Sequence, residues 1–529
     1  MKELDRSTLT LEQKFGLINI ANLNMGRERN LEGALQLIRE HRLGGVYVSQ
    51  YGYKVEEFLA RVRETADYPI LIFVDAEQGH KDYKIPQAIS LNAANSEELA
   101  YSFGRISATA CRRMGCNTVC LPVIDMCNQN APCGGVTRSL GSDKEKIAKI
   151  GAAIARGVRA GGMLSVAKHY PSVPNDFPYD SHMRENYSSM TEEELVDGPL
   201  YAYRKLMEEN LIDGTMTAHT KLINIDPDRP ASLSKPVLDI YRNMGFRGFY
   251  ITDALNMMGV VLKYGVVDPI GLSIAAGNDI PLCWTDNRVE ECEKIKDCFE
   301  RGLFTMEDLD RAVSYVLDAQ HKVAMLPPVP EILDEDVQNI KRLSEECISA
   351  VCDEGYTPAI DRNARHLFVM MVDQELGAVE DFTPGPRHWY IPSDVSEKIN
   401  ELFPNSELTF IPQFPGEAEN HRVFDMQTKF DDVVFITSYT TAAFTGRECL
   451  TSRIVDLMDA LQSADRIVAH MHYGNPFVAE DAPYVPRRII GYASRECVKH
   501  GFEILAGNAP AVGTLPFDLH FHERGHIFY

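Results

Sequence analysis

The sequence lacks every segment that would export the chain or anchor it in a membrane. The N-terminal residues mix both charge signs and contain no apolar core, so we expect no secretory signal. No stretch approaches the run of about 18 apolar residues that a membrane span needs. These absences predict a cytoplasmic protein with no membrane partner.

Positive charge is scarce. The 53 lysines and arginines are outnumbered by 76 aspartates and glutamates, which gives a formal net charge of −23. Such an excess of negative charge disfavours binding to nucleic acid or to an anionic membrane through a basic patch. We therefore expect no nucleic-acid partner and interpret the acidity as a contribution to solubility.

The 12 cysteines do not have the spacing of a metal site. Several of them cluster loosely between residues 111 and 133, but no nearby pair has the two-residue gap of a zinc knuckle. The second half of the chain also lacks a glycine-rich phosphate loop of the Walker or dinucleotide type. The sequence therefore predicts reduced, mostly buried thiols, and it implies neither a metal nor an organic cofactor.

Length and pattern predict two domains. The 529 residues exceed a usual single core, and 45% of them are hydrophobic. Strands alternate with helices over residues 1–325. Three prolines within 327–330 and a predicted helix at 335–351 mark residues 326–357 as a linker and bridging helix. A shorter alternation over residues 358–529 predicts a smaller α/β sandwich domain.

The predicted strands of the first domain are apolar and end in polar residues. Seven strands are expected, at residues 44–49, 69–74, 118–125, 164–169, 214–219, 249–252 and 278–283. Apolar strands that alternate with helices indicate a parallel sheet. A doubly wound sheet gathers its site at one crevice, whereas a barrel brings all strand ends to one face. Polar endings on many strands favour a TIM-like (β/α)8 barrel, and the count of seven predicts that it is irregular or incomplete.

One strand end stands out because a single carboxylate follows it. Phe249–Ile251 reads as a short buried strand, and Asp253 comes directly after it. In a parallel barrel this end of a strand is where catalytic groups lie. The alternative is that Asp253 only caps a helix that begins near Leu255.

A second pattern, Asp180-Ser181-His182, follows a proline-punctuated loop. A carboxylate two residues from an imidazole can fix its tautomer and raise its proton affinity, which suits general acid–base catalysis near neutral pH. The alternative is local hydrogen bonding without any chemical role.

Together with three further motifs, these two stretches resemble the glycoside hydrolase family 3 β-N-acetylglucosaminidases. The five motifs, in order, are Lys168-His169-Tyr170-Pro171, Asp180-Ser181-His182, Met216-Thr217-Ala218-His219, Pro230-Ala231-Ser232-Leu233-Ser234 and Thr252-Asp253-Ala254-Leu255-Asn256-Met257. The resemblance covers residues 8–325 and extends faintly to 474–477 and 513–516. Two departures affect the expected substrate more than the nucleophile: Ser172-Val173-Pro174 replaces the family's Gly-His-Gly, and Gln78-Gly79-His80 replaces its Gly-Gly-Arg.

The resemblance implies a retaining mechanism. Asp253 matches the nucleophile, His182 the acid/base, and Asp180 the partner of that histidine. Four residues match sugar-binding positions: Asp75, Arg138, Lys168 and His169. For Lys168 the alternative is a buried salt bridge with a strand-end carboxylate, and for His219 we expect a supporting structural role.

We therefore expect an exo-acting β-N-acetylglucosaminidase that releases terminal N-acetylglucosamine, for example from cell-wall fragments, and works as a monomer or homodimer. A phosphorylase is the first alternative, because a histidine acid/base, unlike a carboxylate, would not repel an incoming phosphate. A β-glucosidase with an acid from the second domain is the next, although the Asp180–His182 motif argues against it. A non-catalytic sugar-binding protein is the third, and the presence of Asp253, Asp180 and His182 together argues against it.

Overall fold

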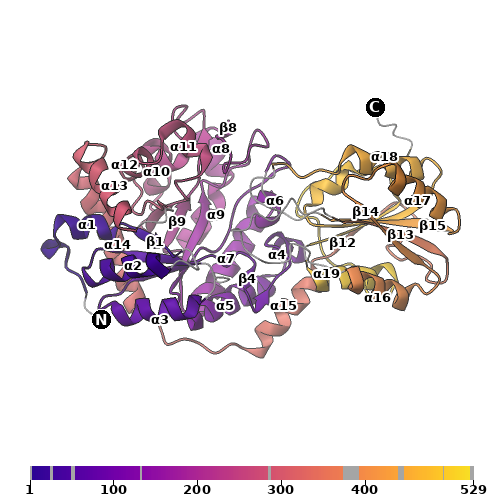
Figure 1. Cartoon of the computed structure of the whole chain (residues 1–529), viewed down its shortest axis with the longest axis horizontal. Helices are drawn as coiled ribbons and strands as arrows, with labels where there is room; N and C mark the ends of the chain where they lie inside the picture. Colours follow the sequence, from indigo (N-terminus) through magenta and orange to yellow (C-terminus); the bar gives the residue numbers. More distant parts are fainter. Residues whose placement is uncertain are drawn as a thin grey trace. The chain divides into compact units, whose positions relative to one another are not determined.

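The computed structural model describes residues 3–23, 28–48, 54–131, 134–283, 288–372, 392–438, 446–492 and 494–524 (Figure 1). It divides the chain into two compact units. The first comprises Met1–Lys84, Glu97–Ala131 and Arg138–Ile340, and the second comprises Ile85–Ser96, Pro132–Thr137 and Lys341–Tyr529. The division after Ile340 lies within the linker predicted at residues 326–357. Two short segments that the sequence pattern placed in the first domain belong to the second unit.

The first unit is built on a parallel sheet whose spatial order follows the chain order. Its strands are β1 (Ile20–Asn22), β2 (Gly45–Val48), β3 (Leu71–Val74), β6 (Thr118–Val119), β7 (Leu164–Tyr170), β9 (Gly214–Thr217) and β11 (Phe249–Thr252). Each strand pairs in parallel with the next. Repeated right-handed crossovers curl such a sheet, so the unit is a TIM-like barrel of irregular form.

The irregularity lies in strands that are shorter than expected, both at the ends of the sheet and in its middle. Of the seven predicted strands, the last, at 278–283, is reduced to one bridge between Ile280 and Ile251, and Pro281 has no N–H to continue the pairing. The strand predicted at 118–125 is short for the same reason, since Pro122 interrupts it. The sequence pattern did not reveal β1, whose three residues are too few to show a period.

Helices connect these strands and surround the sheet (Figure 1). They are α1 (Leu11–Leu17), α2 (Glu28–Arg39), α3 (Val55–Thr65), α5 (Glu97–Met114), α7 (Lys144–Ala160), α8 (Glu192–Asp197), α9 (Leu200–Glu208), α10 (Lys235–Asn243), α11 (Met258–Tyr264), α12 (Asp268–Ala276), α13 (Arg288–Glu300) and α14 (Met306–Ala324). A capping box at Thr10 starts α1, as its sequence predicts. Residues 192–208 form two helices and not one, because Pro199 lacks an N–H and interrupts the hydrogen-bond ladder after Asp197.

In the described part of the chain no single helix is long and apolar enough to cross a membrane, and only the bent pair α11 and α12, taken together, meets that length and composition.

The second unit is a three-layer α/β sandwich. Its sheet has the order β12 (Ser349–Cys352), β17 (Arg487–Gly491), β16 (Ile467–Tyr473), β15 (Asp432–Ser438), β13 (His366–Val372) and β14 (Glu407–Pro412). All pairs are parallel except β12 with β17. Figure 1 shows α17 (Glu417–Gln427) and α18 (Ser452–Gln462) over one face, and α16 (Pro392–Leu402) and α19 (Arg495–Leu505) over the other. The five parallel strands follow the flavodoxin-like order 2-1-3-4-5.

The start of this unit differs from the expected one. The bridging helix predicted at 335–351 is α15 (Asp334–Glu346), which ends earlier, and the residues after it form β12. Ala350, Val351 and Cys352 suit a strand as well as a helix, and pairing with β17 decides between the two.

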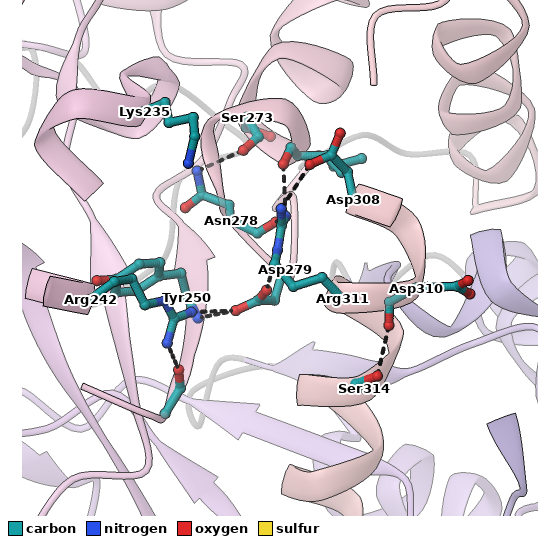
Figure 2. Close-up of polar contacts among 12 residues, drawn as sticks. Lys235, Arg242, Tyr250, Ser273, Asn278, Asp279, Asp308, Asp310, Arg311 and Ser314 are labelled. Carbon is teal, nitrogen blue, oxygen red and sulfur yellow. Dashed lines mark hydrogen bonds and ion pairs between the residues drawn. The ribbon is translucent and has the colours of Figure 1, made fainter. Parts of the chain in front are cut away.

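A buried carboxylate, Asp279, binds the backbone of β11 at Tyr250 and two arginines (Figure 2). Its side chain is fully buried, accepts the Tyr250 N–H at 2.8 Å, and pairs with Arg242 at 2.9 Å and Arg311 at 3.4 Å. Arg242 also lies over the Tyr250 ring, 3.9 Å from its centroid. Burial outweighs both arginines and raises the pKa of Asp279 to about 6. Burying this carboxylate is energetically costly, and its two arginines offset part of that cost. Asp279 in turn fixes the position of β11, the strand that leads to Asp253.

We predict that Asp279→Ala destabilises the barrel by about 3 kcal/mol, because it leaves two arginines facing a buried site without their partner. Chemical denaturation followed by circular dichroism would measure the loss. The matched control is Asp310→Ala, which breaks the half-exposed pair with Lys14 and should cost less than about 1 kcal/mol. Equal losses in both variants would contradict the anchoring role of Asp279.

Candidate active site

Asp253 lies directly after β11. Its backbone N–H bonds to the Thr217 carbonyl at 2.9 Å, which continues the pairing with β9, and its Oδ1 accepts the Ala254 N–H at 2.7 Å. Helix α11 begins only at Met258, and Met257 is its N-cap. Asp253 is therefore not a helix cap, and the alternative explanation of this carboxylate is wrong.

The surroundings of Asp253 favour its ionised form. Burial acts to raise the pKa of this carboxyl. Electrostatic interactions with the rings of His169 and His219 act against burial most strongly, and the Ala254 N–H and Lys168 add to them, so the pKa of Asp253 lies below its usual value. An ionised carboxylate at a strand end can act as a nucleophile.

His219 braces the backbone next to Asp253. Its Nε2 lies 3.0 Å from the Ala254 carbonyl oxygen and its Nδ1 lies 2.8 Å from the Ser232 hydroxyl. Burial lowers the pKa of His219, which favours the neutral imidazole. A neutral ring that donates from Nε2 to the carbonyl accepts the Ser232 O–H at Nδ1. The Pro-Ala-x-Leu-Ser motif thus supplies the residue that sets this tautomer.

A chain of alternating charges connects the ends of β3 and β7. Lys168 is buried and its Nζ lies 2.6 Å from Asp75 and 2.7 Å from Glu77. Arg138 holds Glu77 with two hydrogen bonds, at 2.6 and 2.7 Å. The structure therefore brings together three of the predicted sugar-binding residues, and the salt bridge considered for Lys168 is present. Asp75, with its side chain 46% exposed, is the accessible end of the chain.

Glu77 is the residue of this site that the sequence reasoning did not single out. Burial would raise its pKa, but Arg138 and Lys168 outweigh burial and hold the pKa of Glu77 well below its usual value. Its only sequence signal is its position two residues after Asp75, in the Asp-x-Glu pattern. In an extended backbone this spacing points both carboxylates to the same side.

Asp125 orients His169. One carboxylate oxygen accepts the His169 N–H at 2.7 Å, and the other lies 2.8 Å from the ring Nδ1. Ser172 donates its hydroxyl to Asp125 at 3.0 Å and has a left-handed φ of 59°. Glycine would adopt this φ without strain. The turn is therefore formed even though serine replaces the glycine of the resembled family.

Asp180 and His182 form a local pair. Asp180 Oδ1 accepts the His182 N–H at 2.8 Å and lies 2.9 Å from the ring Nδ1. The Asp180 side chain is 3% exposed, whereas that of His182 is 29% exposed. A buried carboxylate thus holds an accessible imidazole, with Nε2 as the ring nitrogen turned away from Asp180.

The loop that bears this pair is fastened to the segment after Asp253. Gly259 at the start of α11 donates its N–H to the Ser181 carbonyl at 3.0 Å, and Met258 donates to that of His182 at 3.3 Å. A Cβ on Gly259 would lie 2.8 Å from the backbone oxygens of Ser181 and Arg184. Glycine is therefore required here for the close approach.

Both arms of the loop are also tied down. On the incoming side, Asn128 and Asn130 donate their amides to the carbonyl of Asn175 at 3.0 and 3.4 Å. On the outgoing side, the loop leads into β8 (Asn186–Ser188), which pairs in parallel with β10 (Thr220–Leu222) after His219. The loop is thereby connected to three strand ends of the barrel.

The first unit therefore places all eight predicted site residues at the carboxyl ends of strands or in the loops that follow them. Histidine, aspartate, lysine and arginine side chains converge there, as carbohydrate recognition and acid–base chemistry require. Among the described residues no group of three histidine, cysteine or acidic side chains is arranged to hold a metal ion.

Comparison with known proteins agrees with this arrangement. Residues 10–319 match the glycosyl hydrolase family 3 N-terminal domain. A β-N-acetylglucosaminidase/β-glucosidase from Cellulomonas fimi is 24% identical over 493 residues, which are 86% of this chain and 85% of that protein. A β-hexosaminidase from Pseudomonas aeruginosa is 28% identical over 270 residues, which are 48% of this chain and 79% of that protein.

Solved structures share the two-unit fold. A family 3 β-N-acetylglucosaminidase from a Paenibacillus species superposes with a TM-score of 0.80 at 23% identity, over 97% of this chain and 99% of that one. A β-glucoside phosphorylase superposes with a TM-score of 0.81 at 21% identity, over 97% and 94% of the two chains. The chain belongs to glycoside hydrolase family 3, and it is a glycosidase whose substrate is a glycoside.

Proposed function

We propose that the protein is a retaining, exo-acting β-N-acetylglucosaminidase with Asp253 as nucleophile and His182 as acid/base. The observation that carries this proposal is the pairing of His182 with buried Asp180. The loop that bears this pair is hydrogen-bonded to the start of α11, a few residues after Asp253 in the chain. The β-N-acetylglucosaminidase and β-hexosaminidase relatives support the choice of sugar.

In the first step the Asp253 carboxylate attacks the anomeric carbon while the bond from that carbon to the leaving oxygen breaks. Asp180 accepts the Nδ1–H of His182, so the protonated imidazolium presents its Nε2–H to the leaving oxygen, and transfer of that proton leaves the ring neutral. The products are a covalent glycosyl-enzyme and the free leaving group. The lowered pKa of Asp253 keeps this carboxylate ionised at neutral pH.

In the second step His182, now neutral, takes a proton from a water molecule, and the water oxygen attacks the anomeric carbon. The ester bond to Asp253 breaks and the sugar leaves with its anomeric configuration retained. In retaining enzymes the two groups stand about 5 Å apart, which leaves no room for a water between nucleophile and sugar in the first step. The hydrogen bonds from the start of α11 hold the His182 loop against the segment that follows Asp253, which supports the pairing of these two groups.

The charge chain would orient the sugar. Asp75 can accept sugar hydroxyls, while Arg138 and His169 can donate to sugar oxygens. Glu77 acts as a positioning residue, because it fixes the Arg138 fork and the Lys168 ammonium without being the exposed end of the chain. We further propose that the protein acts in the cytoplasm as a monomer or homodimer.

A phosphorylase is the second candidate, and Arg184 favours it. This exposed arginine lies two residues after His182, and the described residues provide it with no ion-pair partner. A neutral histidine and a nearby cation would admit phosphate, where a carboxylate would repel it. The fold shared with a β-glucoside phosphorylase is compatible with both reactions.

We predict that Asp253→Asn lowers kcat/KM for an aryl β-N-acetylglucosaminide by at least about a thousandfold, because the amide cannot form the covalent intermediate. Circular dichroism should show an unchanged fold. Asp226→Asn is a control, because the hydrogen bonds of this carboxylate, from Asp228, Arg229 and Ser234, lie in the loop before α10. Near-normal turnover by Asp253→Asn would remove Asp253 from the nucleophile role.

For His182→Ala we expect a loss that depends on the leaving group. Alkyl glycosides should lose about a hundredfold or more in kcat/KM, whereas dinitrophenyl glycosides, whose leaving oxygen needs little protonation, should lose much less in glycosylation. Burst kinetics would separate this step from hydrolysis of the intermediate. Equal losses in glycosylation across the series would show that His182 is not the acid.

Product analysis with and without phosphate separates the two candidate functions. A hydrolase should release free N-acetylglucosamine in both conditions, with a yield that phosphate does not change. Formation of a sugar 1-phosphate in proportion to added phosphate would instead establish the phosphorylase. If the enzyme cleaved an aryl β-glucoside but not the N-acetylglucosaminide, the proposed mechanism would stand and the proposed sugar would be wrong.

A further inference from the structure

The loop that bears His182 carries an aromatic stack that the catalytic residues do not use. The rings of Phe177 and Tyr179 lie 5.3 Å apart at 16° to each other, and the Arg184 guanidinium covers Tyr179 at 3.9 Å from its centroid. Tyr179 also meets the edge of Tyr187 at 6.4 Å. The Tyr179 ring thus contacts both a second ring and a cation, and Phe177 is the other aromatic member of the stack.

The stack is rigidly joined to the catalytic turn. Met183 and Arg184 both donate their N–H groups to the Asp180 carbonyl at 2.9 Å, and Tyr179 donates to Phe177 at 2.8 Å. Phe177, which precedes His182, and Arg184, which follows it, therefore both contact the Tyr179 ring. Tyr179 is three residues from His182, so their Cα atoms are within about 11 Å of each other.

The outer end of the stack is exposed and apolar. Phe177 is 50% exposed and Met183, on the other side of His182, is 51% exposed. Exposed apolar surface that is held in place commonly marks a binding site. An aromatic face binds flat apolar faces, such as an aryl ring or the C–H face of a pyranose ring.

We propose that Phe177, held by Tyr179 and Arg184, forms the leaving-group subsite and stacks on the first ring of the leaving group. This inference rests on the proposed function, because it takes His182 as the group that protonates the leaving oxygen. The first ring of the leaving group is bonded to that oxygen or to the carbon next to it, so it must lie beside His182. The proposed occupant is an aryl or pyranose ring, and a small alkyl group would gain nothing there.

The test compares benzyl and methyl β-N-acetylglucosaminides, whose leaving alcohols are similar in basicity and differ in the ring. We expect Phe177→Ala to lower kcat/KM for the benzyl substrate about three- to tenfold and to leave the methyl substrate unchanged. Phe177→Trp should retain the benzyl preference. Arg184→Gln, which removes the cation from Tyr179, should lower that preference by a smaller factor.

The matched control is Phe414→Ala, which removes a phenyl ring that is 55% exposed from the second unit. It should change neither substrate. An equal change for benzyl and methyl substrates in Phe177→Ala, or no change in either, would overturn the subsite while the proposed function stands. A wild-type enzyme that cleaves neither substrate, nor an aryl β-N-acetylglucosaminide, would overturn the proposed function and with it this inference.

Discussion

The site depends on buried charges that cannot be left without partners. Lys168 is nearly inaccessible, and its ammonium is tolerated only because Asp75 and Glu77 each approach within 2.7 Å. Glu77 in turn forms ion pairs with two cations, Lys168 and Arg138. Removing one member would leave another buried charge uncompensated, which is far more costly than losing an exposed pair. The charge chain therefore fixes the ends of β3 and β7 relative to each other.

This constraint explains why the salt bridge of Lys168 is compatible with the sugar-binding role proposed for this residue. The alternation of charges leaves Asp75 as the member with an exposed side chain, so sugar hydroxyls can meet a carboxylate whose position is already set. Donors and acceptors that are oriented before the ligand arrives lose little conformational entropy on binding. The same logic applies at Asp180, where a buried carboxylate positions a half-exposed imidazole, and at Asp125 with His169.

The sequence predicted those parts of the molecule that have a local signal. The strand before Asp253 is a continuous apolar run, so its bounds could be read closely. The site residues were predicted from motifs, which keep their order in the chain. Features decided by distant contacts could not be read in this way. Strand β12 depends on pairing with β17, and Glu77 depends on cations some 60 and 90 residues further along the chain.

Ser172 shows how tertiary contacts offset a local preference. It replaces a glycine of the resembled family at a position where a left-handed φ disfavours a side chain by about 1 kcal/mol or more. In the structure the serine keeps that φ and uses its hydroxyl to bind Asp125, with the Tyr203 hydroxyl 3.2 Å away. The gain of a hydrogen bond to a partly buried carboxylate is comparable to the backbone strain. The Ser172 hydroxyl thus helps to hold Asp125, whose carboxylate orients His169, and His169 in turn favours the ionised form of Asp253.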